Sequence, residues 1–340
     1  MTKKRVSIKD IARLAGVSSP TVSRALQGRG RVSTLTRERI TQLANEIGYT
    51  PSLVARGLVT QRSYCVGVVV PSFADPFHSQ VAQGIEEEAR RHQYSIFLAN
   101  TDVDPARELE IARTFHGRQV DGIIVSSSRV GNRYAAWLQE TGIPMVLLNA
   151  HVAFDQIHSI YHDDYQGICL VMQHLIARGY RRIAYISNAR GVRASVERQR
   201  AWFDSMQVAA LPPELLVNGP NGRFHGGAIA TKQLLAQAQA LWQAPPDAIC
   251  CYNDTMAIGA LAELRAQGLK TPTDVAVTGF DDIDVTEFVD PPLTTIRQPR
   301  HQMGVQAMQL LLTLIDDRTA NGYVPRTTVM LGELVVRSST

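Results

Sequence analysis

Short apolar runs rich in β-branched residues alternate with amphipathic stretches through most of the chain, and this alternation constrains the fold more than any other feature. Helical spacing of apolar residues falls between the runs, for instance over 79–92 and 164–178. Strands buried on both faces and separated by helices are typical of a parallel, doubly wound sheet. About ten strands over roughly 275 residues predict two such sheets, and therefore two lobes. The expected strands cover 65–71, 95–100, 122–126, 144–149, 183–187, 248–252 and 275–280.

Polar residues gather where these strands end. Ligands of doubly wound folds bind beyond the carboxyl ends of the strands, so two lobes predict a site in the cleft between them. Carboxylates and amides that bond neighbouring hydroxyls, with an aromatic ring against an apolar face, suit a carbohydrate. The residues at the strand ends are Asp75, Phe77, 126–128, Asn149, Asp163, Asn253, Asp254, Asp281 and Asp282.

Several of these residues have a structural alternative. For Asp254, we expect a role as the N-cap of the following helix in preference to a ligand contact. Asp282 can likewise cap the segment after it, and Asp163 can brace a crossover between the lobes. Phe77 can be an ordinary core residue.

A different pattern at the N-terminus predicts three short helices. Ser7 and Asp10 form a capping box, and Gly16 ends the first helix. Ser18 caps a second helix with Pro20 in its first turn, where a missing N–H group costs nothing. Two helices joined by a glycine-containing turn predict a helix-turn-helix. The buried stripes are expected to be Ile8, Ile11, Ala12 and Leu14 in the first helix, and Ile40, Leu43, Ala44 and Ile47 in a third helix that Gly48 stops.

Charge separates this head from the rest of the chain. Residues 1–62 carry twelve Lys or Arg and three Asp or Glu, a net charge of +9, whereas the remainder carries −5. This asymmetry indicates a nucleic-acid-binding head on a body that does not bind polyanions. The exposed start of the second helix would meet base edges in the major groove, where Arg24 can bond guanine bidentately.

Six ordered segments resemble the lactose repressor (LacI/GalR) family of bacterial transcription regulators. They are VSSPTVSR, the stretch 51–58, VDGIIV, CYNDTMAIGAL, VAVTGFDDI and PPLTTIRQP. The resemblance implies a helix-turn-helix head over 1–50 and a hinge helix with linker over 51–62. It further implies a periplasmic-binding-protein-like α/β body of two doubly wound parallel-sheet lobes over 63–340, which binds an effector and dimerises.

For the head, the resemblance makes Ser19 and Pro20 the specificity pair and Arg24 the base-reading arginine. Pro20 departs from the family pattern because it offers only apolar contact, for instance to a thymine methyl. In the hinge, which would fold only on operator DNA, Leu58 would enter the minor groove beside Ala55, although Leu58 can also be an ordinary linker residue. The full set of implied DNA contacts is Ser18, Ser19, Pro20, Thr21, Ser23, Arg24, Arg31, Ala55 and Leu58.

For the body, the resemblance implies an effector bound between the lobes, a sugar or sugar derivative, although some relatives bind a purine or a phosphorylated partner protein instead. Ala201 stands where the family usually has glycine, close to one implied ligand residue. The implied effector-binding residues are Asp75, Phe77, Asn149, His162, Ser195, Arg198, Phe224, Asn253, Asp281 and Gln298. The predicted function is a sequence-specific repressor of carbohydrate-metabolism genes, controlled allosterically by that small ligand.

Other functions fit less well. The pairs Asp281–Asp282 and His162–Asp163 suggest acid–base or metal chemistry, but neighbouring strand residues point to opposite faces. The sequence contains no phosphate loop, G-x-S-x-G or H-E-x-x-H motif, so we expect no catalytic residue, no metal and no cofactor. A sugar receptor or transport-binding protein would share the body, but it would need an export signal and would have no helix-turn-helix.

The remaining expectations concern location and assembly. No signal peptide or membrane-length apolar run is present, which favours a cytoplasmic, nucleoid-associated bacterial protein that does not contact a membrane. We expect the four cysteines, which lie in apolar runs, to be reduced core residues. Two heads are needed to bind a pseudo-palindromic double-stranded operator, so a homodimer is expected. The final LVVRSST carries no leucine heptad, which disfavours a tetramer joined by a helical bundle.

Overall fold

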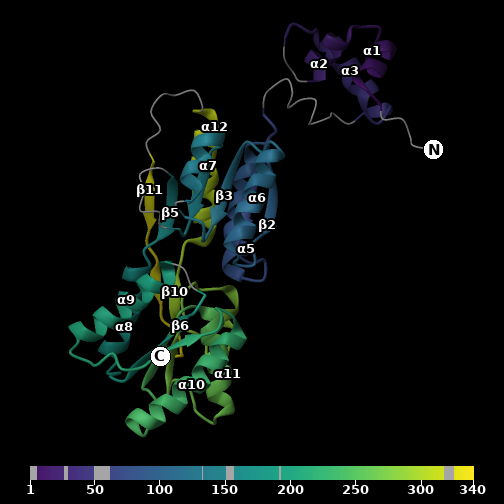
Figure 1. The fold of residues 1–340 in the computed structure, drawn as a ribbon. Coiled ribbons are helices and arrows are strands. Elements are labelled where there is room, and N and C mark those ends of the chain that lie inside the picture. The colour runs from purple at the N-terminus through teal and green to yellow at the C-terminus, as the bar shows by residue number, and fades with distance from the viewer. Residues whose placement is uncertain are drawn as a thin grey trace. The chain divides into compact units, whose positions relative to one another are not determined.

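The structure is a computed structural model that describes residues 6–26, 30–49, 62–131, 133–150, 157–190, 193–317 and 325–340. The chain divides into two compact units, Met1–Ser63 and Tyr64–Thr340 (Figure 1). The first unit is called the head below, and the second is called the body.

Three helices pack around a small core in the head. Ile11, Val22 and Ile40 come from one helix each, and all three are fully buried. The predicted capping box between Ser7 and Asp10 is present. The helices are α1 (Ile8–Ala15), α2 (Ser19–Leu26) and α3 (Thr34–Glu46).

The prediction is wrong for one residue of the head core. Leu14 is 49% exposed, and Ala15 is buried in its place. The stripe that faces the core follows the spacing i, i+3, i+4, i+7 from Ile8, which selects Ala15 and leaves Leu14 on the outer face.

The first lobe of the body, called the N-lobe, is built on a six-stranded parallel sheet. Its strand order is β11-β5-β4-β3-β1-β2. The strands are β1 (Cys65–Val70), β2 (Ser95–Asn100), β3 (Gly122–Ser126), β4 (Met145–Leu148), β5 (His158–His162) and β11 (Thr327–Met330). The helices are α5 (Pro76–Arg91), α6 (Pro105–Gly117), α7 (Arg133–Thr141) and α12 (Arg300–Asp316).

Helices cover both faces of this sheet. One apolar cluster joins α5 and α12 to the strands, and a second joins α6 and α7 to the opposite face. The central strands β1, β3 and β4 are consequently buried on both sides, as predicted. The strand β2 departs from that prediction because it lies at the sheet edge, where Phe97 and Leu98 are 42% and 41% exposed.

The second lobe of the body, called the C-lobe, repeats the same plan on four parallel strands in the order β7-β6-β8-β9. One face packs on α10 and α11, and the other packs on α8 and α9. The strands are β6 (Ile183–Asn188), β7 (Leu216–Gly219), β8 (Ala248–Cys251) and β9 (Ala276–Thr278). The helices are α8 (Asp164–Ala177), α9 (Arg193–Val208), α10 (Phe224–Trp242), α11 (Asp254–Ala266) and the short 3-10 helix η1 (Asp284–Glu287).

The chain passes between the lobes more than once, which ties them into one body. The passages run from β5 to α8, from β10 (Thr295–Arg297) to α12, and from β11 to β12 (Glu333–Val335) (Figure 1). The strands β10 and β12 pair antiparallel beside the C-lobe sheet. The two doubly wound parallel lobes are therefore confirmed, with this small third sheet as an addition. The strands β5, β7, β10, β11 and β12 were absent from the predicted ranges because their sequences mix polar residues into short runs.

Candidate functional site

The exposed face of the head is formed by the start of α2. The Ser18 hydroxyl lies 2.8 Å from the Thr21 hydroxyl and caps the helix, as predicted. Pro20 and Arg24 are exposed one turn apart, and the Arg24 Nε donates to the Pro20 carbonyl oxygen at 3.3 Å. Val22 and Ala25 face the core, so α2 presents its polar side outward.

The other predicted DNA contacts lie in different places. Ser19 and Ser23 are half-buried on α2, and Arg31 is exposed in the segment before α3. Ala55 and Leu58 lie outside the described residues.

The body contains a cleft of about 610 Å³ lined by residues of both lobes. The lining includes eight of the ten predicted effector residues: Asp75, Phe77, Asn149, Arg198, Phe224, Asn253, Asp281 and Gln298. His162 and Ser195 are not in the lining. His162 is fully buried against Phe280, and the Ser195 hydroxyl bonds Ser187 and the carbonyl of Asn188.

Sharp backbone turns bring several strand-end residues into the cleft. Ser127 follows β3, Asn149 follows β4 and Asp281 follows β9, and their φ angles are 52°, 48° and 119°. Left-handed backbone costs roughly 1–3 kcal/mol at such positions and persists where the surrounding structure holds it. The strands thus end abruptly, and their next side chains line the cavity.

Arg198 is the central cation of the C-lobe wall. Its Nε and one terminal nitrogen each lie 2.8 Å from the Asp164 carboxylate, and Nη1 donates to the Tyr252 carbonyl at 2.6 Å. The guanidinium carbon lies 3.6 Å from the centre of the Phe280 ring. Burial alone would lower the pKa of Arg198, but Asp164 and Asp281 raise it. Arg198 therefore stays charged and is held rigidly.

Asp281 lies beside this cation and is also buried. Gln298 donates to its Oδ1 at 2.6 Å, and Arg198 lies 3.8 Å from the same oxygen. Burial raises the pKa of Asp281 well above its ordinary value, and Arg198 offsets only part of that effect. The carboxyl of Asp281 can accept hydrogen bonds from ligand hydroxyls, and its protonated form can also donate one.

Three acidic residues near the cleft have structural alternatives to a ligand role, and the structure tests each alternative. Asn253, not Asp254, caps α11 through Met256 N, which corrects the predicted cap. Asp163 caps α8, in keeping with its crossover interpretation. Ile283 precedes η1 as its cap, so the alternative that Asp282 caps this segment is wrong.

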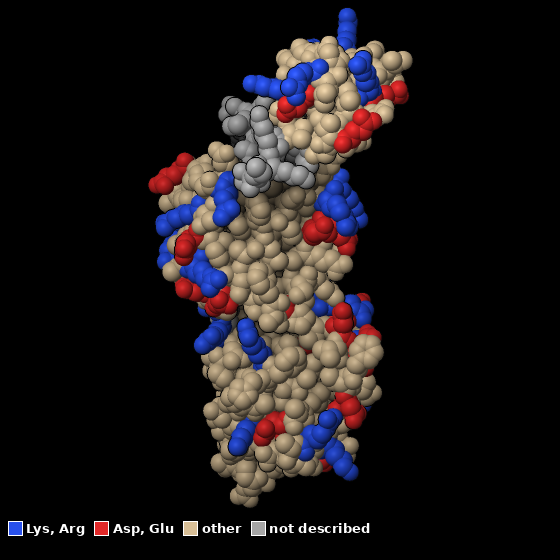
Figure 2. Space-filling view, turned by 90° about the vertical axis from the view of Figure 1, so that its right-hand side faces the viewer, with Lys and Arg blue, Asp and Glu red and all other residues tan. Residues whose placement is uncertain are grey.

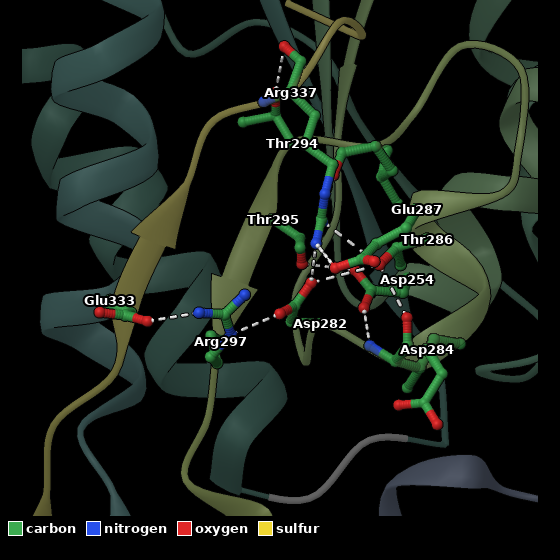
Figure 3. A network of polar contacts seen from close by, with 12 residues as sticks. Asp254, Asp282, Asp284, Thr286, Glu287, Thr294, Thr295, Arg297, Glu333 and Arg337 are labelled. Carbon is green, nitrogen blue, oxygen red and sulfur yellow. Dashed lines mark hydrogen bonds and ion pairs between the residues drawn. The ribbon is translucent and has the colours of Figure 1, made fainter.

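Asp282 instead belongs to a polar network behind the cleft. Figure 3 shows it between Arg297 at 2.6 Å and Arg337 at 2.8 Å, which come from β10 and from the segment after β12. Burial would raise the pKa of Asp282, but both arginines lower it overall. Asp254 accepts bonds from Thr295 and from Ile283 N, and its burial raises its pKa to about 6.

The cleft also contains residues that the sequence did not single out. Among them, Arg129 follows β3, Arg190 follows β6 and Arg223 follows β7. Arg223 donates to the Ser72 hydroxyl at 3.2 Å, which links the two lobes. The strand-end rule that selected Asn149 also applies to these arginines, but β7 was not predicted, and arginines were not sought at strand ends.

Among the described residues, no group of three His, Cys, Asp or Glu side chains is placed to hold a metal ion. No described helix is both long enough and apolar enough to cross a membrane. Cys250 and Cys251 are buried, whereas Cys65 and Cys169 are half-buried, and all four are free thiols.

A helix-turn-helix head joined to a two-lobed body with a polar cleft defines a regulator that couples a DNA-binding head to a binding-protein-like body. Comparison with known proteins agrees. Residues 7–52 match the model of bacterial regulatory proteins of the lacI family, and residues 172–340 match that of a periplasmic binding protein-like domain. The chain belongs to the LacI family and is a DNA-binding transcriptional repressor.

Relatives similar to this chain are regulators rather than enzymes. The repressor CytR of Escherichia coli (strain K12) is 33% identical over 336 residues, which are 98% of this chain and 96% of that protein. The repressor PurR of Vibrio vulnificus (strain CMCP6) is 33% identical over 98% of both chains.

Solved structures extend the likeness over the full length. A lac repressor dimer bound to operator and the anti-inducer ONPF matches with a TM-score of 0.86 and 26% identity over 99% of both chains. A complex of the regulator CelR with cellobiose matches with a TM-score of 0.73 and 30% identity, over 99% of this chain and all of that one.

Proposed function

We propose that this protein is a homodimeric repressor of carbohydrate-metabolism genes in the bacterial cytoplasm, released from or tightened on its operator by a sugar or sugar derivative in the body cleft. The head over 1–50 reads the DNA through the start of α2. The segment 51–62 is the hinge that transmits the state of the body over 63–340.

The cleft carries this proposal. Its volume of about 610 Å³ is in the range of small-molecule sites. Asn149, Asn253 and the Asp281–Gln298 pair supply amides and a carboxyl for ligand hydroxyls, and Phe224 is an exposed ring 49% accessible to solvent. This combination of polar forks and an aromatic face suits a pyranose or furanose. The cellobiose bound to CelR is a precedent in a relative.

The dimer is supported by the surface of the N-lobe. Phe73, Phe97 and Leu98 are exposed at the edge formed by β2 and α6. Figure 2 shows an area of the N-lobe without Lys, Arg, Asp or Glu side chains. Neighbouring exposed apolar side chains such as Phe97 and Leu98 are typical of protein interfaces. A two-fold dimer brings two heads to the two halves of an operator.

The test is a thermal unfolding screen of the full chain against monosaccharides, disaccharides and sugar phosphates. We expect at least one sugar to raise the unfolding midpoint, and Phe224→Ala to weaken its binding roughly tenfold because the aromatic contact is lost. Leu241→Ala is the control, since Leu241 is 50% exposed on the same helix and does not line the cleft. The proposal is contradicted if no sugar stabilises a protein that still binds DNA.

A further inference from the structure

Two arginines from different lobes line the cleft, one half-buried and one exposed. Arg129 follows β3 in the N-lobe, and Arg190 follows β6 in the C-lobe. Among the described residues, neither guanidinium group makes a hydrogen bond or an ion pair. Their backbones are nonetheless fixed, because Arg129 N donates to Glu108 and Arg190 N donates to Asn188, both at 3.0 Å. The main chain therefore fixes where each side chain begins, and its guanidinium group remains available to a ligand.

The other charges of the cleft are largely compensated. Arg198 is paired with Asp164, and Asp102 is paired with Arg107 at 2.8 Å. Burial favours the neutral form of Asp281. Of the lining carboxylates only Asp75 lacks an arginine partner among the described residues; it accepts from Phe77 N. The cleft thus keeps an excess of positive charge from Arg129, Arg190 and Arg223.

Holding Arg129 and Arg190 in one cavity is unfavourable without an anion. Arg129 is half-buried, and this burial lowers its pKa; Tyr252 and Glu108 offset part of that effect, and the charge of Arg190 adds to it. A partly desolvated guanidinium without a counter-ion costs free energy that a bound anion would recover. The planar fork of arginine matches the oxygens of a phosphate group.

We propose that the ligand of the cleft is a phosphate monoester of a sugar, with its phosphate bound between Arg129 and Arg190 and its sugar on the amide and carboxyl side. This inference rests on the proposed function and specifies its ligand class. One arginine comes from each lobe, so the phosphate bridges the lobes and stabilises their approach beside the Arg223–Ser72 contact. Two guanidinium groups favour a phosphate dianion over the single charge of a sugar acid.

The first test uses inorganic phosphate, which needs no knowledge of the sugar. Phosphate replaces chloride at constant ionic strength, up to about 50 mM, and the unfolding midpoint of the full chain is measured. We expect a rise of roughly 2–4 °C in the wild type and its loss in both Arg129→Gln and Arg190→Gln. Arg178→Gln is the control, because Arg178 is exposed at the far end of α8 and should leave the rise intact. No rise, or an equal rise in all four proteins, overturns the inference.

A second set of probes separates this inference from the proposed function. Ribose with ribose 5-phosphate, and glucose with glucose 6-phosphate, are compared alongside glucuronate. Preference for a phosphorylated member, removed by Arg129→Gln, supports the inference, whereas preference for glucuronate overturns the phosphate assignment. A neutral sugar that binds and changes operator affinity equally in wild type and both arginine variants overturns the inference and supports the proposed function. Phosphate binding at the arginines without any change in operator affinity supports the site and contradicts the proposed function.

Discussion

Arg198 shows how one residue links the structure of the C-lobe to its cleft. Its guanidinium lines the cavity, yet its charge is compensated by Asp164, which starts the crossover helix α8. Both side chains are 5% exposed. Removing one partner of a buried ion pair leaves the other charge desolvated, which is far more costly than losing a surface pair.

We therefore predict that Asp164→Asn lowers the free energy of unfolding by about 3 kcal/mol. Urea unfolding of the full chain measures this change. Arg200→Gln is the control on the adjacent helix α9, because Arg200 is 57% exposed in its pair with Glu197 and should cost less than about 1 kcal/mol. If both substitutions lowered the free energy of unfolding equally, the buried pair would contribute no more to stability than the exposed pair.

The titration of Asp254 makes the free energy of unfolding of the protein depend on pH. Its burial raises its pKa from 3.8 to about 6, so the folded state binds the proton more tightly than the unfolded chain does. Its contribution to stability is therefore fully present below pH 4 and is lost as the pH rises through about 6. Asp254→Asn keeps an oxygen for Ile283 N but removes the titration.

The predicted quantity is the difference in free energy of unfolding between Asp254→Asn and the wild type. Between pH 4 and pH 7, Asp254→Asn should gain roughly 2–3 kcal/mol of stability relative to the wild type. Urea unfolding at both pH values measures it, and the comparison cancels other groups such as buried His78. A difference that does not change with pH would contradict the assignment.

At the scale of elements, close helix packing depends on individual glycines. A Cβ on Gly84 of α5 would overlap the carbonyl of His301, and one on Gly304 of α12 would overlap the carbonyl of Val81. The two helix backbones touch at this point, beside the passage from β10 to α12. No flexible side chain is available to move aside.

Gly84→Ala should therefore destabilise the body by about 1–3 kcal/mol through overpacking. Gly117→Ala is the matched control at the end of α6, where a Cβ meets nothing within 4 Å. It should be neutral or stabilise by up to about 1 kcal/mol, since alanine restricts the unfolded chain. Thermal unfolding of both variants decides, and similar midpoints would refute the packing argument.

The spacing of apolar residues predicted the bounds of strands and helices better than it predicted which of them are buried. The runs at β2 and β3 were placed with the observed bounds because each is a short, mostly apolar run, and β3 is rich in β-branched residues. The start of α5 was placed three residues too late, because Asp75 caps the helix and Pro76 occupies its first turn. The exposure of β2 could not be predicted, since strand order is a property of the tertiary fold.

The candidate site was predicted to a similar extent. The strand-end rule found residues such as Asn149 and Asp281, which line the cleft. It could not distinguish lining residues from those just behind them. His162 ends β5 but lies against Phe280, and Gly332 also packs against it. Such distinctions depend on which side chain fills the remaining volume, and a one-dimensional pattern does not contain that information.

At the scale of the whole molecule, the proposed dimer predicts a specific surface. Leu98→Glu would bury an unpaired charge in the interface and should weaken self-association roughly thirtyfold or more. Analytical ultracentrifugation measures this, and operator affinity should fall in parallel. Val208→Glu is the control, because Val208 is 89% exposed in the C-lobe. A Leu98→Glu protein that remains a dimer would place the interface elsewhere.

If the cleft controls the head, ligand binding must change the affinity for operator DNA, and one titration measures this change. Operator duplex selected by the protein from random DNA is titrated with the full chain, with and without a saturating concentration of the ligand that most stabilises it. We predict a 5- to 150-fold change in operator affinity, which corresponds to about 1–3 kcal/mol of coupling. Identical affinities with the cleft occupied and empty would contradict it.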